Sequence, residues 1–546
     1  MHYVAERFTP EEEATLRPYF TNLDGPVFAL VNLPEVVKGA LFARYSRSSK
    51  SLRRLFLDEF VSELDLTGDL TVDATIGLRR AEELYERVFL EYGDDSVAQL
   101  GGVHLACEQA SNILTKVLEW GRLMAYLEQS TRYIPYDSRL GGLYRYLRPP
   151  SILQSRFGAR YVGDLDSLFD SYAAALPRLM DWARDRYPKD PSDSDFVYKQ
   201  SIKAKACDAA RGMLPSATLS NVGIYGTGQA FEALLLRMRA HPLPEARSYS
   251  TLMLEELRKV IPSFLTRVDR PDRGIAWSRY LEDTAAETEA VVAKMFCDET
   301  AEPRPAVTLT DFDPEGEDKV IAAICYSHLE LADDQLLARV RRLTTDERAS
   351  ILRAYVGERA NRRHKPGRAF ERTDYRFDVV CDYGAFRDLQ RHRMLTIEWQ
   401  RLTPRLGFEH PLAISDAGLD ALFEDAMGCS ASLHDDLEAT FPVEASYAVA
   451  LAYRIRFAMQ MNAREAVHLL ELRTSPQGHP AYRVVGQEMH RLIAEHAGHR
   501  ALADAMSHVD HHDHDLERLA GERAAAARRA TRDGSAATTE SEVAGS

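Results

Sequence analysis

The stretch "FRDLQRHRMLTIEWQ", residues 386–400, decides how this chain is organised, because a diverged copy of it, "LTKVLEWGRLMAYLEQ", occupies residues 114–129. The alignment places Arg122 of the earlier copy opposite Arg393 of the later copy. Residues 387–405 contain five arginines and a histidine. Cations packed this densely repel one another unless an anionic group lies among them. The stretch therefore predicts an anion-binding function for the later copy.

Two further blocks of sequence repeat in the same order along the chain. They are "VVKGALFARYSRSSKSLRRLF" from Val36 with "VIAAICYSHLELADDQLLARV" from Val320, and "GTGQAFEALLLRMRAHPLPEA" from Gly226 with "MNAREAVHLLELRTSPQGHPA" from Met461. Chance agreement of helical periodicity is the alternative explanation, but three blocks in one order favour duplication followed by divergence. We therefore expect a first repeat over residues 1–300, a second over residues 301–520, and a low-complexity, disordered tail over residues 521–546.

The apolar patterns predict both helices and strands. "YRFDVVCDYGA" from Tyr375 alternates in polarity and carries β-branched residues, which predicts a strand leading into the arginine-rich stretch. The segment from Glu444 to Arg473 contains no glycine or proline, which favours one long helix. The mixture predicts an α+β fold.

The overall composition narrows the class of protein. An apolar share of 45% and a charged share of 28% are typical of a soluble globular chain. The formal charge of −15 disfavours a nucleic-acid binder, which needs a basic surface. Neither a signal-peptide pattern nor a run of about 18 apolar residues is present, and the six cysteines are scattered. We expect a cytoplasmic protein that binds a small anion and neither nucleic acid nor a membrane.

A second group of polar residues stands near the end of the second repeat. At helical spacing, Asn462, Ala466, Leu469 and Arg473 share one face, and Arg464 and His468 form a neighbouring i,i+4 pair. Internal salt bridges with Glu465 and Glu471 are the alternative to a binding site. The Arg391-His392-Arg393 cluster has a similar alternative, a surface turn neutralised by Asp388 and Glu398.

These two clusters, in this order, resemble the flavin-dependent thymidylate synthases. The hallmark of that family is Arg-His-Arg, a short spacer and Ser-x-Arg, followed by Asn-x-Arg and a Leu-x-Leu-Arg helix. Arg391-His392-Arg393, Asn462-Ala463-Arg464 and Leu470-Glu471-Leu472-Arg473 match these elements, and His468 falls where the family has Asn or His near the flavin. The resemblance implies that each repeat is a domain of mixed helix and antiparallel sheet, of the thymidylate-synthase-complementing type.

Each repeat lacks what the other retains. The first repeat has Trp120-Gly121-Arg122 in place of Arg-His-Arg and Thr227-Gly228-Gln229 in place of Asn-x-Arg, but keeps "EQSTRY" with Ser130 and Arg132. Its "GDDSVAQ" from Gly93 resembles the family's Gly-His-x-Ser-Val-x-Glu with two replacements. The second repeat offers Thr403-Pro404-Arg405 for Ser-x-Arg only with an insertion. We therefore expect one site assembled from both repeats.

The resemblance implies a role for individual residues in this composite site. The implied catalytic residues are Arg391 and Arg473. The implied FAD-binding residues are Arg391, His392, Arg393, Asn462, Arg464 and His468. The implied substrate-binding residues are Glu128, Ser130, Arg132, Arg405 and Arg473.

The implied reaction is FAD-dependent C5 methylation of a pyrimidine nucleotide, most simply of dUMP to dTMP, with methylenetetrahydrofolate and NADPH as co-substrates. Another nucleotide such as UMP, and a catalytically inactive flavin- or nucleotide-binding scaffold, remain alternatives. Because the family forms tetramers, two tandem chains would supply four homologous units, so we expect a homodimer.

Metal binding is not expected. "HVDHHDHD" places His508 and His512, or His511 and Asp515, at helical i,i+4 spacing, but a solvated helix end explains this pattern better.

Overall fold

The computed structural model describes most of the chain after residue 100. The described residues are 7–20, 23–24, 32–35, 37–38, 41, 51–59, 61, 99, 101–139, 141–191, 193–512 and 519. The tail predicted for residues 521–546, the "GDDSVAQ" segment except Gln99, and much of the block from Val36 lie outside these residues.

The chain divides into two compact units that each draw on separated segments. Unit 1 comprises Met1–Glu108, Val117–Glu128 and Asn221–Glu299, and unit 2 comprises Gln109–Lys116, Gln129–Ser220 and Thr300–Ser546. Unit 2 thus combines a long segment of the first repeat, Gln129–Ser220, with the second repeat. Arg132 of the first repeat and Arg391 of the second repeat therefore belong to one compact unit.

The first repeat forms a three-stranded sheet in the order β1-β3-β2, from β1 (Gly102–Ser111), β2 (Met124–Glu128) and β3 (Leu219–Thr227). A short helix, α5 (Asn112–Leu118), follows β1, and β2 pairs antiparallel with β3. After β3 come α9 (Gly228–Ala240), α10 (Pro244–Arg258), η5 (Pro262–Leu265) and α11 (Gly274–Met295). Earlier described helices are α1 (Pro10–Leu16) and α3 (Leu52–Glu59).

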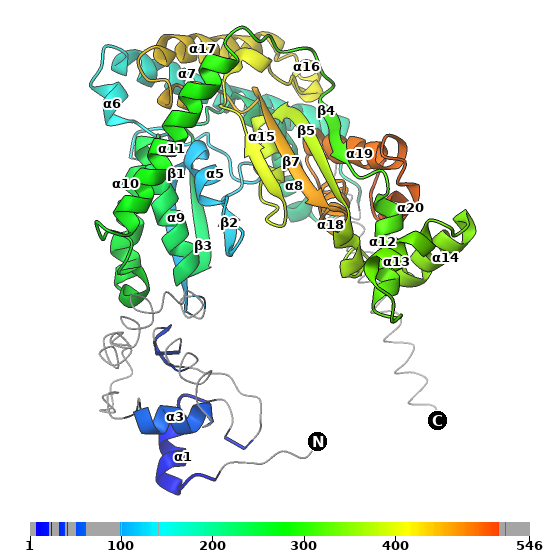
Figure 1. The fold of residues 1–546 in the computed structure, drawn as a ribbon. Helices are drawn as coiled ribbons and strands as arrows, with labels where there is room; N and C mark the ends of the chain where they lie inside the picture. Colours follow the sequence, from blue (N-terminus) through cyan, green and yellow to red (C-terminus); the bar gives the residue numbers. More distant parts are fainter. Residues whose placement is uncertain are drawn as a thin grey trace, which may run out of the picture. The chain divides into compact units, whose positions relative to one another are not determined.

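The second repeat forms a four-stranded sheet in the order β4-β5-β7-β6, in which every neighbouring pair is antiparallel (Figure 1). Its strands are β4 (Val307–Phe312), β5 (Asp374–Asp382), β6 (Thr396–Trp399) and β7 (Arg454–Asn462). The helices α15 (Tyr383–Leu389), α18 (Ala463–Arg473) and α19 (Pro480–Glu495) pack against these strands. Every second residue of β5 and β7 is buried, so one face of the sheet lines the core.

Other helical segments complete unit 2. In the first-repeat segment, α7 (Gly158–Arg186) packs against α8 (Asp195–Ala210), which leads into η4 (Arg211–Met213). The remaining segments are α6 (Pro150–Leu153), α12 (Gly316–Tyr326), α13 (Asp333–Val340), α14 (Thr345–Val356), η6 (Arg368–Arg372), η7 (Pro404–Leu406), α16 (Leu412–Asp416), α17 (Asp420–Glu438), η8 (Glu444–Ala448) and α20 (Arg500–Asp504).

The topology confirms the predicted α+β class and the two repeats. In each repeat a strand runs into a short helix, a second strand follows, and a third strand inserts between the first two before two helices. The order β1-β3-β2 therefore corresponds to β5-β7-β6, with β4 added at the edge of the second sheet. The strand expected from Tyr375 is confirmed as β5.

The long helix expected from Glu444 to Arg473 is wrong. The segment forms the short helix η8, then the strand β7, and becomes helical only at Ala463. Ile455, Phe457, Met459 and Met461 are buried in β7 while the residues between them are half-buried, which is the two-residue period of a strand. Pairing with β5 on one side and β6 on the other outweighs the helical propensity of Ala, Arg, Met and Gln.

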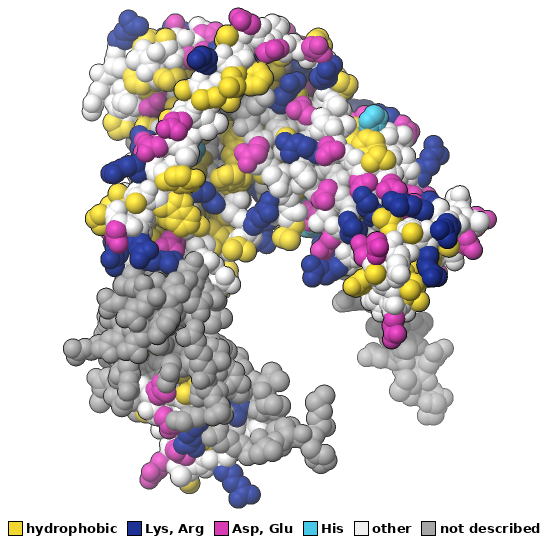
Figure 2. Space-filling model, in the orientation of Figure 1, with side chains coloured by type: hydrophobic (Ala, Val, Ile, Leu, Met, Phe, Trp, Pro, Cys, Tyr) yellow, Lys and Arg dark blue, Asp and Glu magenta, His cyan; other side chains and the backbone are white. Residues whose placement is uncertain are grey.

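Charged side chains of both signs are interspersed over the face of the molecule shown in Figure 2. In the part of the chain that the structure describes, no helix has the length and apolar content needed to cross a membrane.

Candidate functional site

The Arg-His-Arg segment lies in the turn between α15 and β6. The side chain of Asp382 caps α15 by accepting a hydrogen bond from the backbone of Ala385 at 2.9 Å. Phe386 anchors the helix against Phe457 of β7, with ring centroids 4.9 Å apart. The helix ends at Leu389, and the following turn directs His392 into the protein, where only 6% of it is exposed. Arg393 remains at the surface.

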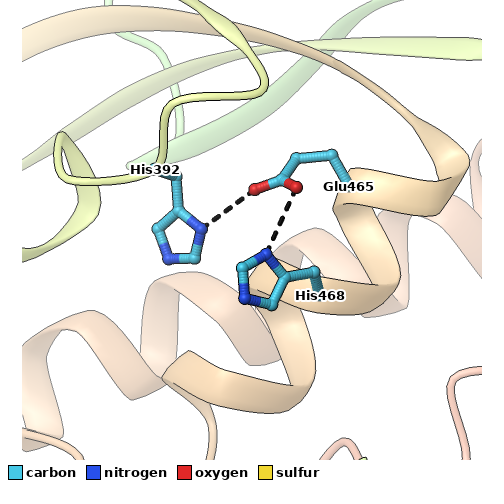
Figure 3. Close-up of side chains that lie close together, drawn as sticks. All are labelled: His392, Glu465 and His468. Carbon is cyan, nitrogen blue, oxygen red and sulfur yellow. Dashed lines mark hydrogen bonds and ion pairs between the residues drawn. The ribbon is translucent and has the colours of Figure 1, made fainter. Parts of the chain in front are cut away.

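A buried carboxylate, Glu465, joins two histidines (Figure 3). His392 Nδ1 lies 3.0 Å from Glu465 Oε1, and His468 Nδ1 lies 3.2 Å from Glu465 Oε2. On the other side of the His392 ring, Arg473 Nε donates to His392 Nε2 at 3.0 Å. Because a guanidinium can only donate, His392 Nε2 accepts and the ring proton is assigned to Nδ1.

The electrostatics agree with a neutral His392 beside an ionised Glu465. Burial lowers the pKa of His392 to about 4, and the nearby Arg473 charge acts in the same direction. Burial alone would raise the pKa of Glu465, but hydrogen bonds from His392 and His468 outweigh it and bring that pKa to about 2. The contact between His392 and Glu465 is therefore a charge-assisted hydrogen bond, not an ion pair.

Asp388 is the centre of a neighbouring group of arginines. Its carboxylate lies 3.4 Å from Arg391 Nη1, 3.7 Å from Arg211 Nη1 and 4.0 Å from Arg473 Nη1. Burial would raise the pKa of Asp388, but the charges of Arg391, Arg473, Arg211 and Arg132 outweigh it and hold that pKa well below its usual range.

Arg132 brings the first repeat into contact with the second. Its Nε and Nη2 donate hydrogen bonds to the two carboxylate oxygens of Asp208 at 2.9 and 2.8 Å, and both side chains are largely buried. Its Nη1 donates to the Tyr482 hydroxyl at 3.1 Å and to the Gln477 carbonyl at 3.3 Å. Tyr482 is close to two arginines, because the Arg132 and Arg473 guanidinium carbons are 6.0 and 5.4 Å from its ring centroid. Residues of both repeats thus meet within unit 2.

The arginine cluster carries a net positive charge. Arg132, Arg211, Arg391 and Arg473 face the carboxylates of Asp208 and Asp388, with Asp382 as a third acid near Arg211. Burial raises the pKa of Asp382 to about 6, so this acid contributes nearly a full negative charge at pH 7. Within this group four guanidinium groups face three carboxylates, with the ionised Glu465 on the far side of His392, and the excess positive charge of the group suits an anion.

Arg211 and His479 complete the cluster. Arg211 is only 4% exposed, and its Nη2 has no hydrogen-bond partner among the residues that the structure describes. His479 accepts from the backbone of Ala481 through Nδ1, which caps α19 and leaves its proton on Nε2. Burial lowers the pKa of His479 to about 3, and Arg211 lowers it further. A neutral donor thus lies among the arginines.

Only part of this cluster was predicted from the sequence. Arg391, His392, His468, Arg473 and Arg132 were predicted and are brought into contact, directly or through one shared partner. Asp208, Arg211, His479 and Tyr482 were missed. One usable signal was the charged pair Asp208 and Arg211 inside the apolar run "CDAARGMLPSA", where burial demands a partner.

Other predicted site residues have different surroundings. Asn462 caps α18 by accepting from Glu465 N at 2.9 Å, and Arg464 bonds to the Pro366 carbonyl and to Glu371. Arg405 pairs with Glu438, and Ser130 Oγ accepts from the backbone of Arg132. Glu128 is buried at the end of β2 in unit 1, where it pairs with Val222. The internal pairs considered as an alternative are met in part, since His468 contacts Glu465 and Arg391 contacts Asp388, whereas Glu471 pairs with Arg359.

In the first repeat, different side chains surround the segment that corresponds to Arg-His-Arg, Trp120-Gly121-Arg122. The Arg237 guanidinium lies over the Trp120 ring, 5.0 Å from its centroid. A side chain at Gly121 would meet the Tyr126 hydroxyl at 2.7 Å. Gln229 is hydrogen-bonded to Gln99 at 2.7 Å. Trp120 and Gly121 therefore stand where the second repeat has Arg391 and His392, while Arg237 keeps a cation beside them.

Two groups of described side chains have the spacing of metal ligands, His392 with Glu465 and His468, and His434 with Asp435 and Glu438. A metal on His392 Nδ1 would place the ring proton on Nε2, facing the Arg473 Nε–H, so this donor set does not fit an ion without loss of that contact. In the second group Glu438 is held by Arg405.

The C-terminal histidines do not share a common centre. His508 bonds to the Arg359 carbonyl, His511 to His490 and His512 to Asp510, whereas Asp515 lies outside the described residues.

Comparison with known proteins gives a family and several relatives. The family model described as thymidylate synthase complementing protein matches residues 40–263 and 308–497, one match in each repeat. A UPF0159 protein of Chlamydia muridarum (strain MoPn / Nigg) is 38% identical over 516 residues, covering 94% of this chain and 97% of that protein. Relatives with the same description in Chlamydia pneumoniae and Thermoplasma acidophilum are 37% and 31% identical, covering 94% and 89% of this chain and 97% of each relative.

Among solved structures, a UMP/dUMP methylase from Streptomyces cacaoi bound with 5-Br dUMP is 17% identical and covers 36% of this chain and 94% of its own. Its TM-score is 0.28.

Fold and site together define an α+β protein of two repeats that share one buried, positively charged cluster. The chain belongs to the thymidylate synthase complementing protein family, as the two family matches show.

Proposed function

We propose that this protein methylates C5 of a pyrimidine nucleotide, most simply converting dUMP to dTMP. Its family membership supports a thymidylate synthase-like methyltransferase. By the resemblance of its motifs, the cofactor is FAD, the carbon donor is methylenetetrahydrofolate and the hydride donor is NADPH. UMP is the alternative substrate.

The observation that carries the proposal is the joining of both repeats around Tyr482 and Asp388. Arg132 and Arg211 come from the first repeat, and Arg473 comes from the second. A nucleotide phosphate is a dianion that suits the planar fork of arginine donors, and the cluster has positive charge in excess. Arg211 Nη2 is buried without a hydrogen-bond partner among the described residues, and a phosphate oxygen would supply that partner.

The predicted flavin residues divide into two groups. Arg393 is exposed and Arg464 is partly exposed, so their guanidinium groups are accessible to the diphosphate of a dinucleotide. His392 has both ring nitrogens engaged, and Asn462 caps α18, so these two residues support the site from within. Arg391, Arg393 and Arg464 would therefore hold the FAD through its diphosphate.

In the proposed reaction, the protein supplies placement and charge. When bound, the flavin would supply the hydride chemistry. Arg473 would contact the nucleotide from one side, and Arg132 and Arg211 would hold the phosphate of the nucleotide from the other side. Arg391 and Arg473 would stabilise negative charge that develops on the pyrimidine during attack by C5.

A catalytically inactive nucleotide or flavin binder is the second candidate. The observation that favours it is the state of Arg132, whose Nε, Nη1 and Nη2 already donate to Asp208, Tyr482 and the Gln477 carbonyl. Phosphate binding through Arg132 would require exchange of at least one of these contacts. Activity, not binding, separates the two candidates.

The test uses purified full-length protein. Flavin content is read from the absorbance spectrum, and bleaching is followed after NADPH is added under anaerobic conditions. Formation of dTMP is then measured with dUMP and methylenetetrahydrofolate, and UMP replaces dUMP in a parallel assay. Methyl transfer to either nucleotide supports the proposal. Bound flavin and nucleotide without any methylated product would support the inactive binder instead.

We also propose a homodimer, because two duplicated chains supply the four homologous domains expected from the family resemblance. Light scattering during gel filtration tests this assembly, and a monodisperse monomer would contradict it.

A further inference from the structure

Glu465 is not one of the residues that define the Arg-His-Arg, Asn-x-Arg and Leu-x-Leu-Arg elements, yet its carboxylate contacts two of the site's imidazoles (Figure 3). We propose that Glu465 is a positioning residue that keeps the ring proton of His392 on Nδ1, so that Nε2 faces Arg473 as an acceptor and orients its guanidinium group.

The direction of each hydrogen bond follows from Arg473. A guanidinium has five donors and no acceptor, so the contact from Arg473 Nε identifies His392 Nε2 as the acceptor in this structure. A neutral imidazole then has its single proton on Nδ1, which must find an acceptor because the ring is buried. Glu465 Oε1, at 3.0 Å, is that acceptor.

Glu465 itself is held from two directions. Its backbone N–H donates to the Asn462 cap at the start of α18. Its second carboxylate oxygen, Oε2, accepts a hydrogen bond from His468 Nδ1 at 3.2 Å. The carboxylate has one histidine donor on each oxygen and little freedom to rotate, so α18 sets the orientation of the His392 ring.

The contact between His392 and Arg473 also orients Arg473 within the arginine cluster. Since Nε of Arg473 is taken by His392, the Nη groups of Arg473 are left to face Asp388 and the Tyr482 ring. If the His392 proton moved to Nε2, two donors would face each other in a buried site and Arg473 would have to move. Glu465 therefore acts on Arg473 through His392 without contacting it.

Two substitutions separate the acceptor from the charge. Glu465→Leu removes the acceptor, and Glu465→Gln keeps one carbonyl oxygen. In the Gln variant the amide oxygen should stay toward His392, because that orientation keeps an acceptor for the Nδ1 proton while Arg473 still donates to Nε2. The amide NH2 would then face His468, whose proton should move to Nε2. Glu495→Gln, an exposed change on α19, is the matched control.

Proton–nitrogen correlation spectra of protein labelled with 15N-histidine, at pH 7, test the inference without reference to activity. His392 and His468 are assigned by comparison with His392→Gln and His468→Gln. In the wild type we expect a neutral His392 with the proton on Nδ1. Glu465→Leu should lose this signal, and Glu465→Gln and Glu495→Gln should retain it. A wild-type His392 with its proton on Nε2, a doubly protonated His392, or an unchanged signal in Glu465→Leu would overturn the inference.

Two further measurements complete the test. Titration of the wild type with Zn²⁺ should leave the Nδ1 proton signals in place, and their loss at one equivalent would assign the group to a metal and overturn the positioning role. The second measurement rests on the proposed function: calorimetry should show dUMP binding about ten- to a hundredfold weaker in Glu465→Leu and near wild type in Glu465→Gln. Absence of dUMP binding in the wild type would count against the proposed function alone, and the spectra would still decide the role of Glu465.

Discussion

Arg132 Nη1 donates to the Tyr482 hydroxyl at 3.1 Å, and this contact joins the first repeat to the second within one chain. The same tyrosine ring lies beside Arg473, whose guanidinium is the last element of the second repeat's motif. A duplicated chain can lose different motif elements from its two copies if the remaining elements still meet. The contacts around Tyr482 show such a meeting.

The Arg132–Asp208 pair should contribute to stability as well as to binding. Arg132→Met leaves a buried carboxylate without its principal partner, and removal of one member of a buried ion pair costs about 3–5 kcal/mol. Arg211 and His479 still face Asp208, so we expect the lower end of that range. Urea unfolding of Arg132→Met, Asp208→Leu and the double variant tests this expectation. The double variant should be more stable than the sum of the single losses predicts; simple additivity would show that the pair has no coupling.

Arg211 should bind the phosphate and not the nucleoside. Arg211→Met should weaken dUMP binding by about ten- to a hundredfold, because a charge-assisted contact is lost. Binding of deoxyuridine, which lacks the phosphate, should change little. Arg491→Met, an exposed change on α19, serves as the control. Equal weakening of dUMP and deoxyuridine would show that Arg211 acts through the fold and not through the phosphate.

The buried histidines should make the protein sensitive to acid. His392 and His479 have pKa values lowered by burial from 6.5 to about 4 and about 3. Both pKa values are lower in the folded state than in the unfolded state. The free energy of unfolding is therefore highest above pH 6.5 and falls as the pH drops toward 4 for His392 and 3 for His479. The shift for His392 corresponds to roughly 3 kcal/mol at most. Urea unfolding between pH 7.5 and 4.5 should show falling stability, with a shallower fall in His479→Gln. A stability that does not change over this range would contradict the neutral, buried assignment.

Flavin retention should depend on the second repeat. His392→Ala removes the acceptor for Arg473, and Arg464→Ala removes a guanidinium that is accessible at the start of α18. We expect both variants to be purified with sharply lower flavin content, measured by absorbance, at a thermal stability that shows the protein is folded. The matched change in the first repeat, Arg122→Ala, should leave flavin content unaltered. Wild-type flavin content in both second-repeat variants would remove the support for a flavin site there.

Much of the architecture could be predicted from the sequence, because the repeats and the alternation in β5 are local patterns. The strand β7 could not be predicted, since its Ala, Arg, Met and Gln residues favour a helix and only pairing with β5 and β6 makes them a strand. The site shows the same limit. Arg391, His392 and Arg473 carry a recognisable motif, whereas Arg211 and Tyr482 enter the cluster only because chain segments distant in sequence fold together. The proton on His392 Nδ1 depends on three side chains at once, and no single segment encodes it.

A calorimetric cycle with dUMP tests the composite site most directly. The proteins are the wild type, Arg132→Lys from the first repeat, Arg473→Lys from the second, and the double variant; lysine keeps the charge but loses the planar fork. We predict that each single change weakens dUMP binding by about tenfold or more and that the double change is far from additive, because both arginines flank Tyr482. Wild-type affinity in folded Arg132→Lys would contradict the account, since the first repeat would then take no part in the site.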